Sequence, residues 1–340
     1  MSLLGTDLPL VAAPMAGGAT TLDLVAAAAS AGCFGFLAAG YKSADAMASD
    51  IAAARERGLS ELGVNLFLPG ASGLTEPDFR RYAGLLQPEA DRFGIDLGAA
   101  PLREDDDDWP AKVDLLVRDP VPVVSITFGL PAAKDVRALQ RVGTRVLVTV
   151  TTVEEARAAA ALDVDGLIAQ GSAAGGHSGT HDPRRPIHPI ATEALVRDVV
   201  AATRLPVIAG GGVDGPDAVR TILAAGADAV AVGTLLLRTD ESGASRTHRD
   251  ALADPRFTET VITRAFTGRP ARGLRNAFID AHEAEAPYGY PAIHHLTRGL
   301  RRAAAEAGDP DRVHLWAGTG SRNATTGPAS DTLRRLATQL

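Results

Sequence analysis

The sequence contains a single cysteine, Cys33, among its 340 residues, so it cannot form an internal disulfide. One thiol also excludes a cysteine-rich metal site and is typical of a protein from the reducing cytoplasm, where we expect Cys33 to serve as a small buried packing residue. Aromatic residues are scarce as well, at 4% of a chain that is 46% hydrophobic. The core must therefore be built mainly from Ala, Val and Leu.

Excess positive charge and long apolar runs are also missing. The formal net charge is −7 and there is no long Lys/Arg tract, so we expect neither nucleic acid nor an anionic membrane surface as a partner. The apolar runs are too short for a membrane span, and the first ten residues lack the pattern of a secretory signal. We expect a cytoplasmic protein with a small-molecule substrate, and the sequence leaves open whether it forms a homo-oligomer.

Short apolar runs, most of them followed by an Ala-rich helical stretch, indicate the fold. There are eight such runs, at 10–13, 35–38, 62–66, 121–127, 146–150, 167–169, 207–209 and 229–232. Strands this continuously apolar are typically covered on both faces, and helices between them suit right-handed parallel crossovers. The pattern predicts a TIM (β/α)8 barrel. An open doubly wound sheet is the alternative, but its GxGxxG turn belongs after the first strand, where this chain reads APMAGGATT.

The barrel is expected to occupy residues 1–240, with 67–120 inserted between its third and fourth strands. The insert has expected helices at 77–93 and 109–117 and an acidic run at 104–108, which we interpret as a solvated loop because consecutive carboxylates cannot all face one cation. Residues 241–310, rich in Arg, His and Tyr, predict a helical cap over the barrel mouth. Residues 311–340 are expected to pack back on the barrel through a helix with Leu333, Leu336 and Leu340 on one face.

Three strands run directly into glycine-rich turns: GSAAGGHSG at 171–179, AGGG at 209–212 and VGT at 232–234. Glycine lets backbone N–H groups approach a phosphate or a flat ring closely. TIM barrels commonly bind phosphate after these last strands, and tight turns without a ligand are the alternative. The expected phosphate cup consists of Gly210, Gly211, Gly212, Gly233 and Thr234.

His177, within the first of these turns, is the candidate catalytic residue. A histidine can take a proton from a carbon acid or, when protonated, pair with an anionic substrate. Asn65 and Gln170 are polar amides at the ends of apolar strands, so each is expected to meet a ligand or a neighbouring strand. His181 and His188 lack a carboxylate or cysteine at ligand spacing, and we predict no metal site.

Seven short motifs together resemble those of one enzyme family. They are APMAGG (13–18), GVNLF (63–67), SITFG (125–129), AQGSAAGGHSG (169–179), AGGGV (209–213), VGT (232–234) and LWAG (315–318). Their order resembles the nitronate monooxygenases, formerly called 2-nitropropane dioxygenases, and the tail is similar to the class I branch. The resemblance covers nearly the whole chain and implies FMN as cofactor, O2 as oxidant and no required metal.

The resemblance also implies roles for individual residues. Those it gives to FMN are Pro14, Met15, Asn65, Gln170, Gly175, Gly176 and the cup residues, with His177 left to face the substrate. Further candidates for the substrate pocket are Ser125, Phe128 and Tyr288. The implied reaction is the oxidation of alkyl nitronates by O2 to carbonyl compounds with release of nitrite, and of nitroalkanes if His177 acts as a base.

Two positions depart from the family pattern, because Ala173 and Ser178 stand where relatives commonly carry Glu and Arg. This departure bears on the substrate more than on the fold or the cofactor. An FMN-dependent reductase that uses NADH, of the enoyl-acyl-carrier-protein or quinone type, is the main alternative. A barrel that binds a phosphorylated metabolite or flavin without turnover is a further one.

Overall fold

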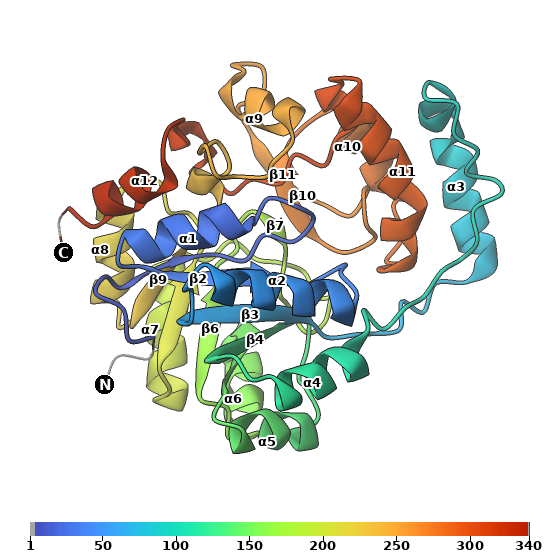
Figure 1. Ribbon diagram of the computed structural model, residues 1–340. Helices are drawn as coiled ribbons and strands as arrows, with labels where there is room; N and C mark the ends of the chain where they lie inside the picture. Colours follow the sequence, from blue (N-terminus) through green and yellow to red (C-terminus); the bar gives the residue numbers. More distant parts are fainter. Residues whose placement is uncertain (1–3, 339) are drawn as a thin grey trace.

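The computed structural model describes residues 4–338 and 340, in which eight parallel strands close into a barrel (Figure 1). The strands are β1 (Leu10–Ala12), β2 (Phe34–Ala38), β3 (Leu62–Phe67), β4 (Val123–Thr127), β5 (Arg145–Val150), β6 (Gly166–Gln170), β8 (Val207–Gly210) and β9 (Ala229–Val232). Strand β9 pairs with β1 through Ala231 and Val11, which closes the ring. The predicted TIM barrel is therefore confirmed, and the open sheet is excluded.

Helices surround the barrel on its outer face. They are α1 (Leu22–Ser30), α2 (Ala44–Glu56), α4 (Trp109–Arg118), α5 (Ala133–Arg141), α6 (Val153–Ala160), α7 (Thr192–Thr203), α8 (Pro216–Ala224) and α12 (Ala329–Leu336). Several begin at a side chain that caps the first turn: the hydroxyls of Thr21, Ser43 and Thr152 accept hydrogen bonds from the backbone N–H three residues later. Such caps fix where each helix starts.

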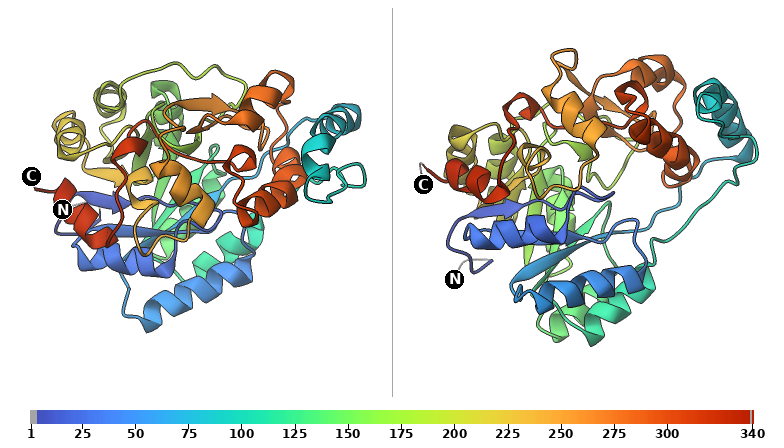
Figure 2. Two further views of the ribbon diagram at one scale, coloured as in Figure 1. Left: turned by 90° about the horizontal axis from the view of Figure 1, so that it is seen from above. Right: turned by 45° about the horizontal axis from the view of Figure 1, so that its top comes forward.

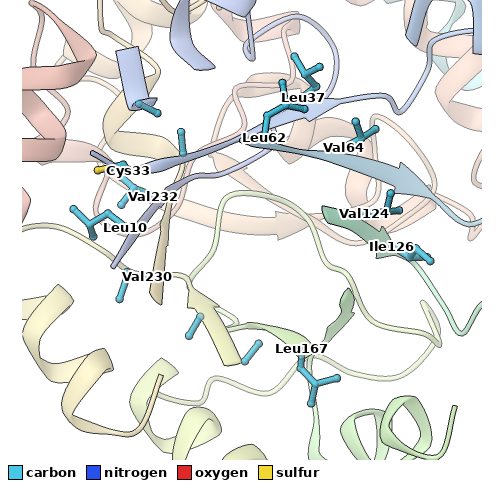
Figure 3. Packing of buried hydrophobic residues seen from close by; sticks show 14 of the residues in the cluster. Leu10, Cys33, Leu37, Leu62, Val64, Val124, Ile126, Leu167, Val230 and Val232 are labelled. Atoms are coloured by element: carbon cyan, nitrogen blue, oxygen red, sulfur yellow. The ribbon is translucent and has the colours of Figure 1, made fainter. Parts of the chain in front are cut away.

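Alternation along the strands separates two apolar layers. Residues such as Leu37, Val124 and Leu167 point outward and pack between the strands and the helices, as Figure 3 shows. Cys33 belongs to this outer layer and is 2% exposed, and burial raises the pKa of its thiol to about 11. The opposite face forms the inner layer, with Phe36 and Leu147 among its members. Along β5 the next inward position after Leu147 is the polar Thr149, which lies towards the mouth of the barrel.

After β9 the chain leaves the barrel and builds a cap over its mouth (Figure 2). The cap elements are η1 (Thr234–Leu236), α9 (Arg246–Ala253), β10 (Thr260–Thr263), β11 (Ala271–Leu274), α10 (Ala277–His282), η2 (Glu283–Glu285) and α11 (Ala292–Glu306). The cap that we predicted as helical also contains an antiparallel sheet, because β11 pairs with both β10 and β7 (Gly176–His177). The glycine-rich turn with His177 is thereby attached to the cap.

The insert between β3 and β4 is divided between the barrel and the cap. Helix α4 lies on the barrel wall, whereas α3 (Glu76–Asp91) packs against α11 at the side of the cap (Figures 1 and 2). Phe79 and Tyr82 of α3 are buried there against Phe266 and Ile293. The hydroxyl of Tyr82 donates to the carbonyl of Ala265 at 2.6 Å.

The C-terminal segment returns from the cap to the barrel through η3 (Pro310–Arg312) and η4 (Ser321–Asn323). This segment pairs with β11 through an antiparallel β-bridge between Gly273 and Trp316. It ends in α12, which packs against α1. Leu333 and Leu336 are buried as expected, but Leu340 is 52% exposed because α12 ends at Leu336. Residues 1–3 and 339 lie outside the described residues. Residues 1–3 belong to the range predicted for the barrel and to the segment examined for a secretory signal, and residue 339 belongs to the predicted C-terminal segment. No described helix is both long and apolar enough to span a bilayer.

Candidate active site

A cavity of about 680 Å³ lies at the carboxyl ends of the barrel strands, between the barrel and the cap. Its walls come from the turns after the strands, from α9 and α11, and from the segment around Trp316. This is the end of a TIM barrel at which ligands bind, and the volume is in the range of small-molecule and cofactor sites.

The cavity brings together most of the residues that the sequence nominated. Those that line it are Pro14, Met15, Asn65, Phe128, Gln170, Gly175, Gly176, His177, Gly210, Gly211, Gly212, Gly233 and Thr234. Two nominated residues are not among the lining residues. Ser125 is fully buried behind Asn65, and Tyr288 packs its ring against the guanidinium groups of Arg184 and Arg264.

The proposed phosphate cup has a backbone that requires glycine. Gly211 and Gly212 have φ of +123° and +74°, in the region that L side chains rarely adopt. A Cβ atom on Gly211 would also lie 3.0 Å from the carbonyl oxygen of Gly171. On the opposite side, the N–H of Gly318 donates to Oγ1 of Thr234 at 2.9 Å. The turn thus exposes main chain, without side-chain bulk, to the cavity.

The two strand-end amides serve mainly to hold their neighbours. Gln170 donates to the carbonyl of His177 at 3.0 Å and accepts from the N–H of Gly179 at 2.6 Å, so it fixes both sides of the turn. Asn65 donates to the hydroxyls of Ser125 and Thr127 at 2.9 and 3.0 Å. Neighbouring protein groups therefore position both amides at the cavity wall, in addition to whatever ligand they meet.

Gly175 allows the main chain of the turn to approach the C-terminal segment. A Cβ atom there would lie 2.5 Å from the backbone nitrogen of Gly318 and 2.6 Å from the carbonyl carbon of Ala317. Because real Cβ atoms do not approach this closely, no larger residue fits without displacing one of the two segments. The following residue, Gly176, has φ of +78° and begins β7.

His177 lies in a wall of aromatic rings. The ring centroids of Phe128, Tyr290 and Trp316 are 5.8, 5.6 and 5.5 Å from the centroid of the imidazole. Its Nε2 atom is 2.9 Å from Oγ1 of Thr267, which fixes the orientation of the ring.

The imidazole of His177 is neutral at physiological pH. Enclosure by protein, together with the positive charges of Arg269 and Arg301, lowers its pKa to about 3. Of the two roles that the sequence left open for His177, that of a cationic partner for an anion is therefore disfavoured. The positive charge comes from arginines instead.

The cavity is lined by basic side chains and by no carboxylate among the described residues. Lys42, Arg298, Arg301 and Arg302 line it, and all but Lys42 belong to α11. Arg301 is 4% exposed and donates to the carbonyl of His294 at 2.9 Å and to Oγ1 of Thr297 at 3.0 Å. Burial lowers the pKa of its guanidinium to about 10, so the group remains charged. Such a wall favours anionic ligands.

Arg269 places a second buried cation near the histidine turn. It donates to the carbonyls of Ser178 and Thr180, and its guanidinium carbon lies 4.0 Å from the centroid of the Phe128 ring. Arg269, which no motif identified, thus places a buried positive charge from the cap beside Ser178.

The acidic run at 104–108 joins the insert to its neighbours. Asp107 pairs with Lys112 at 2.8 Å, Asp105 lies 2.6 Å from Nε2 of His295 on α11, and Asp108 accepts from the N–H of Ala44. Within the described residues, no three His, Cys, Asp or Glu side chains gather as metal ligands would.

Comparison with known proteins supports the family resemblance that the sequence motifs indicated. The model of the nitronate monooxygenase family matches residues 2–339. A probable nitronate monooxygenase of Staphylococcus aureus strain Newman is 33% identical, with 99% of this chain and 96% of that protein aligned.

Two solved structures extend the comparison. Nitroalkane oxidase from Streptomyces ansochromogenes is 46% identical and has a TM-score of 0.92, with 98% of this chain and 95% of that chain covered. FabK from Thermotoga maritima is 25% identical and has a TM-score of 0.75, with coverages of 98% and 93%. Because the family model spans almost every residue, and because the strands and turns that carry the resemblance converge on one cavity, we conclude that this oxidoreductase enzyme belongs to the nitronate monooxygenase family.

Proposed function

We propose that the protein uses FMN to oxidise alkyl nitronates with O2, giving a carbonyl compound and nitrite. The observation that carries this proposal is a cavity with a glycine cup at one part of its wall and the buried Arg301 together with a neutral histidine at another. A flavin phosphate and an anionic substrate both require positive potential and the absence of carboxylates. The cavity meets both requirements.

The residues present fit FMN. The backbone of Gly210, Gly211 and Gly212, with Gly233 and Thr234, would hold its phosphate, since glycines leave the N–H groups of this turn uncovered by side chains at the cavity wall. Pro14, Met15 and the main chain of Gly175 and Gly176 would contact the flavin ring, with Asn65 and Gln170 at its polar edge. When bound, FMN supplies an acceptor for the electrons of the substrate and passes them to O2.

The remaining residues bind and orient the substrate. Arg301 and Arg298 attract the negative charge of a nitronate, whereas Phe128 and Trp316 close the site with apolar surface. Exclusion of water by these rings strengthens the attraction between the arginines and the anion.

Thr267 decides which nitrogen of His177 is free to act. Its hydroxyl lies 3.3 Å from the carbonyl of Arg269 and 2.9 Å from Nε2 of the imidazole. When the hydroxyl donates to that carbonyl, Nε2 carries the imidazole proton and Nδ1 is left as the acceptor.

The low pKa of His177 makes it a weak base. Removal of a proton from a neutral nitroalkane is therefore less favourable than binding of a nitronate that is already ionised. This favours nitronates over nitroalkanes as substrates.

The similarity to FabK favours a second candidate, an FMN-dependent reductase that takes electrons from NADH. One experiment tests both. Protein reconstituted with FMN is supplied with an alkyl nitronate in air, and oxygen consumption and nitrite are measured. The same protein is then given NADH with a quinone or an enoyl thioester. We expect nitrite formation coupled to oxygen consumption; NADH oxidation without any reaction of the nitronate would establish the reductase instead.

A further inference from the structure

Tyr41 lies in the loop between β2 and α2 and lines the cavity beside Gly40 and Lys42. We propose that its hydroxyl donates a hydrogen bond to an oxygen of the bound substrate. The identity of that substrate rests on the proposed function, whereas the role of the hydroxyl rests on the following contacts.

The backbone of Tyr41 is held in an unfavourable conformation. Its φ is +68°, in the left-handed region, which for a bulky side chain costs free energy that the surrounding structure must supply. The N–H of Tyr41 donates to Oδ1 of Asp107 at 2.8 Å, and Oδ2 of Asp107 accepts from Nζ of Lys112 at 2.8 Å. The same Nζ donates to the carbonyl of Ala39 at 2.9 Å. A buried ion pair thus holds both ends of this short loop.

The ring of Tyr41 is fixed as firmly as its backbone. It stacks on the imidazole of His294, with centroids 4.1 Å apart and planes 6° apart, and meets Phe67 edge-on at 5.3 Å. His294 is itself held by Arg301, which donates to its carbonyl and approaches its Nδ1 at 3.3 Å. The ring is therefore part of the same rigid wall as the arginine.

The hydroxyl of Tyr41 is buried and makes no hydrogen bond of normal geometry with a described group, although the hydroxyl of Tyr290 is near enough to interact with it. Burial raises its pKa to about 12, which outweighs the opposite effects of the nearby Tyr290 and Arg301. The group stays protonated at neutral pH, so it is available as a donor. Phenylalanine would fill the same space without the cost of a buried hydroxyl that lacks a well-formed hydrogen bond. A hydroxyl retained at this cost is explained if a ligand accepts from it.

The position of the hydroxyl relative to the other site residues points to the substrate. Tyr41 stacks on His294, the ring of Tyr290 lies 6.2 Å from that of His294, and the same Tyr290 ring lies 5.6 Å from the imidazole of His177. Tyr41 and His177 therefore belong to one wall of aromatic rings, and the charges of Arg301 and Arg269 act on both. A nitronate carries its charge on two oxygens, and a neutral O–H donor forms a strong, charge-assisted hydrogen bond with such an oxygen.

The test compares Tyr41→Phe with Tyr288→Phe, which removes the same hydroxyl from a tyrosine outside the cavity lining. Binding of nitrate to the oxidised holoenzyme is measured by calorimetry at constant ionic strength, because nitrate is a planar anion with charged oxygens on nitrogen. We expect the Kd for nitrate to rise about 10- to 100-fold in Tyr41→Phe and to stay unchanged in Tyr288→Phe. We also expect the melting temperature of Tyr41→Phe to be unchanged or higher.

The proposal is overturned if nitrate binds both variants and the unmodified protein equally, or does not bind the unmodified protein. It is also overturned if Tyr41→Phe melts at a clearly lower temperature, since the hydroxyl would then have a structural role. Nitrate binding requires no turnover, so a failure here is separate from a failure of the oxidation of nitronates.

Discussion

Replacement of His177 by Asn tests whether the cavity holds a neutral imidazole. The unfolded chain binds a proton at a pKa near 6.5, whereas enclosure and two nearby arginines lower the pKa in the folded protein to about 3. Between these values the unfolded state binds more protons, so the folded state loses stability as the pH falls from 6.5 towards 3. Above pH 6.5 the residue makes no pH-dependent contribution.

The size of the effect follows from the shift. At pH 5 an unfolded-state pKa of 6.5 gives a linkage penalty of about 2 kcal/mol for a fully enclosed histidine. His177 retains some exposed surface towards the cavity, and water there reduces the penalty to about 1–2 kcal/mol. We therefore expect the His177→Asn variant to lose about 1–2 kcal/mol less stability than the unmodified protein when the pH falls from 7 to 5.

The measurement is the free energy of unfolding by urea at pH 7 and pH 5. His188→Asn is the matched control, because His188 is exposed outside the main cavity. The control should lose as much stability as the unmodified protein over this interval, and His177→Asn should lose less. Equal losses in all three proteins would show that His177 is not held neutral by its surroundings.

Three further predictions concern other parts of the site. Gly211→Ala should weaken FMN retention at least tenfold and destabilise the protein by about 1–2 kcal/mol, because φ is +123° there, whereas Gly215→Ala, with extended backbone and open space, should do neither. Arg301→Met should raise the KM for nitronates about tenfold without loss of folding stability, and Arg197→Met on the exposed face of α7 should not alter KM. The thiol of Cys33 should react with a disulfide reagent only under denaturing conditions, since burial raises its pKa to about 11; rapid reaction of the native protein would contradict the buried position.

The barrel could be predicted because the sequence patterns that specify its strands and turns are local. Each strand is a short, mainly apolar run, and each turn of the proposed phosphate cup follows directly from its strand in the sequence. The sequence predicted that glycines at these turns let main chain approach a ligand closely. The backbone angles at Gly211 and Gly212 show that the turn requires glycine.

Features that depend on distant contacts could not be predicted in the same way. Strand β7 is only Gly176–His177, with no apolar alternation, and it exists because β11 pairs with it from almost one hundred residues away. The sequence pattern of the arginines in α11 is that of a solvated helix face, whereas in the fold Arg301 is buried and lines the cavity. The Arg- and His-rich composition of residues 241–310 was the only signal that pointed towards them.

Tyr41 gave no signal at all in the sequence. Its left-handed backbone is held by Asp107 and Lys112, more than sixty residues away. A role for such a residue can be inferred only from its burial and its hydrogen bonds in the folded protein.

The most direct test of the account is a single-turnover experiment without oxygen. The FMN-loaded protein is mixed anaerobically with an alkyl nitronate, and the absorbance of the flavin is followed. The account predicts rapid loss of the oxidised flavin spectrum with the nitronate and little change with NADH. A flavin that stays oxidised with nitronates and is reduced quickly by NADH would contradict it.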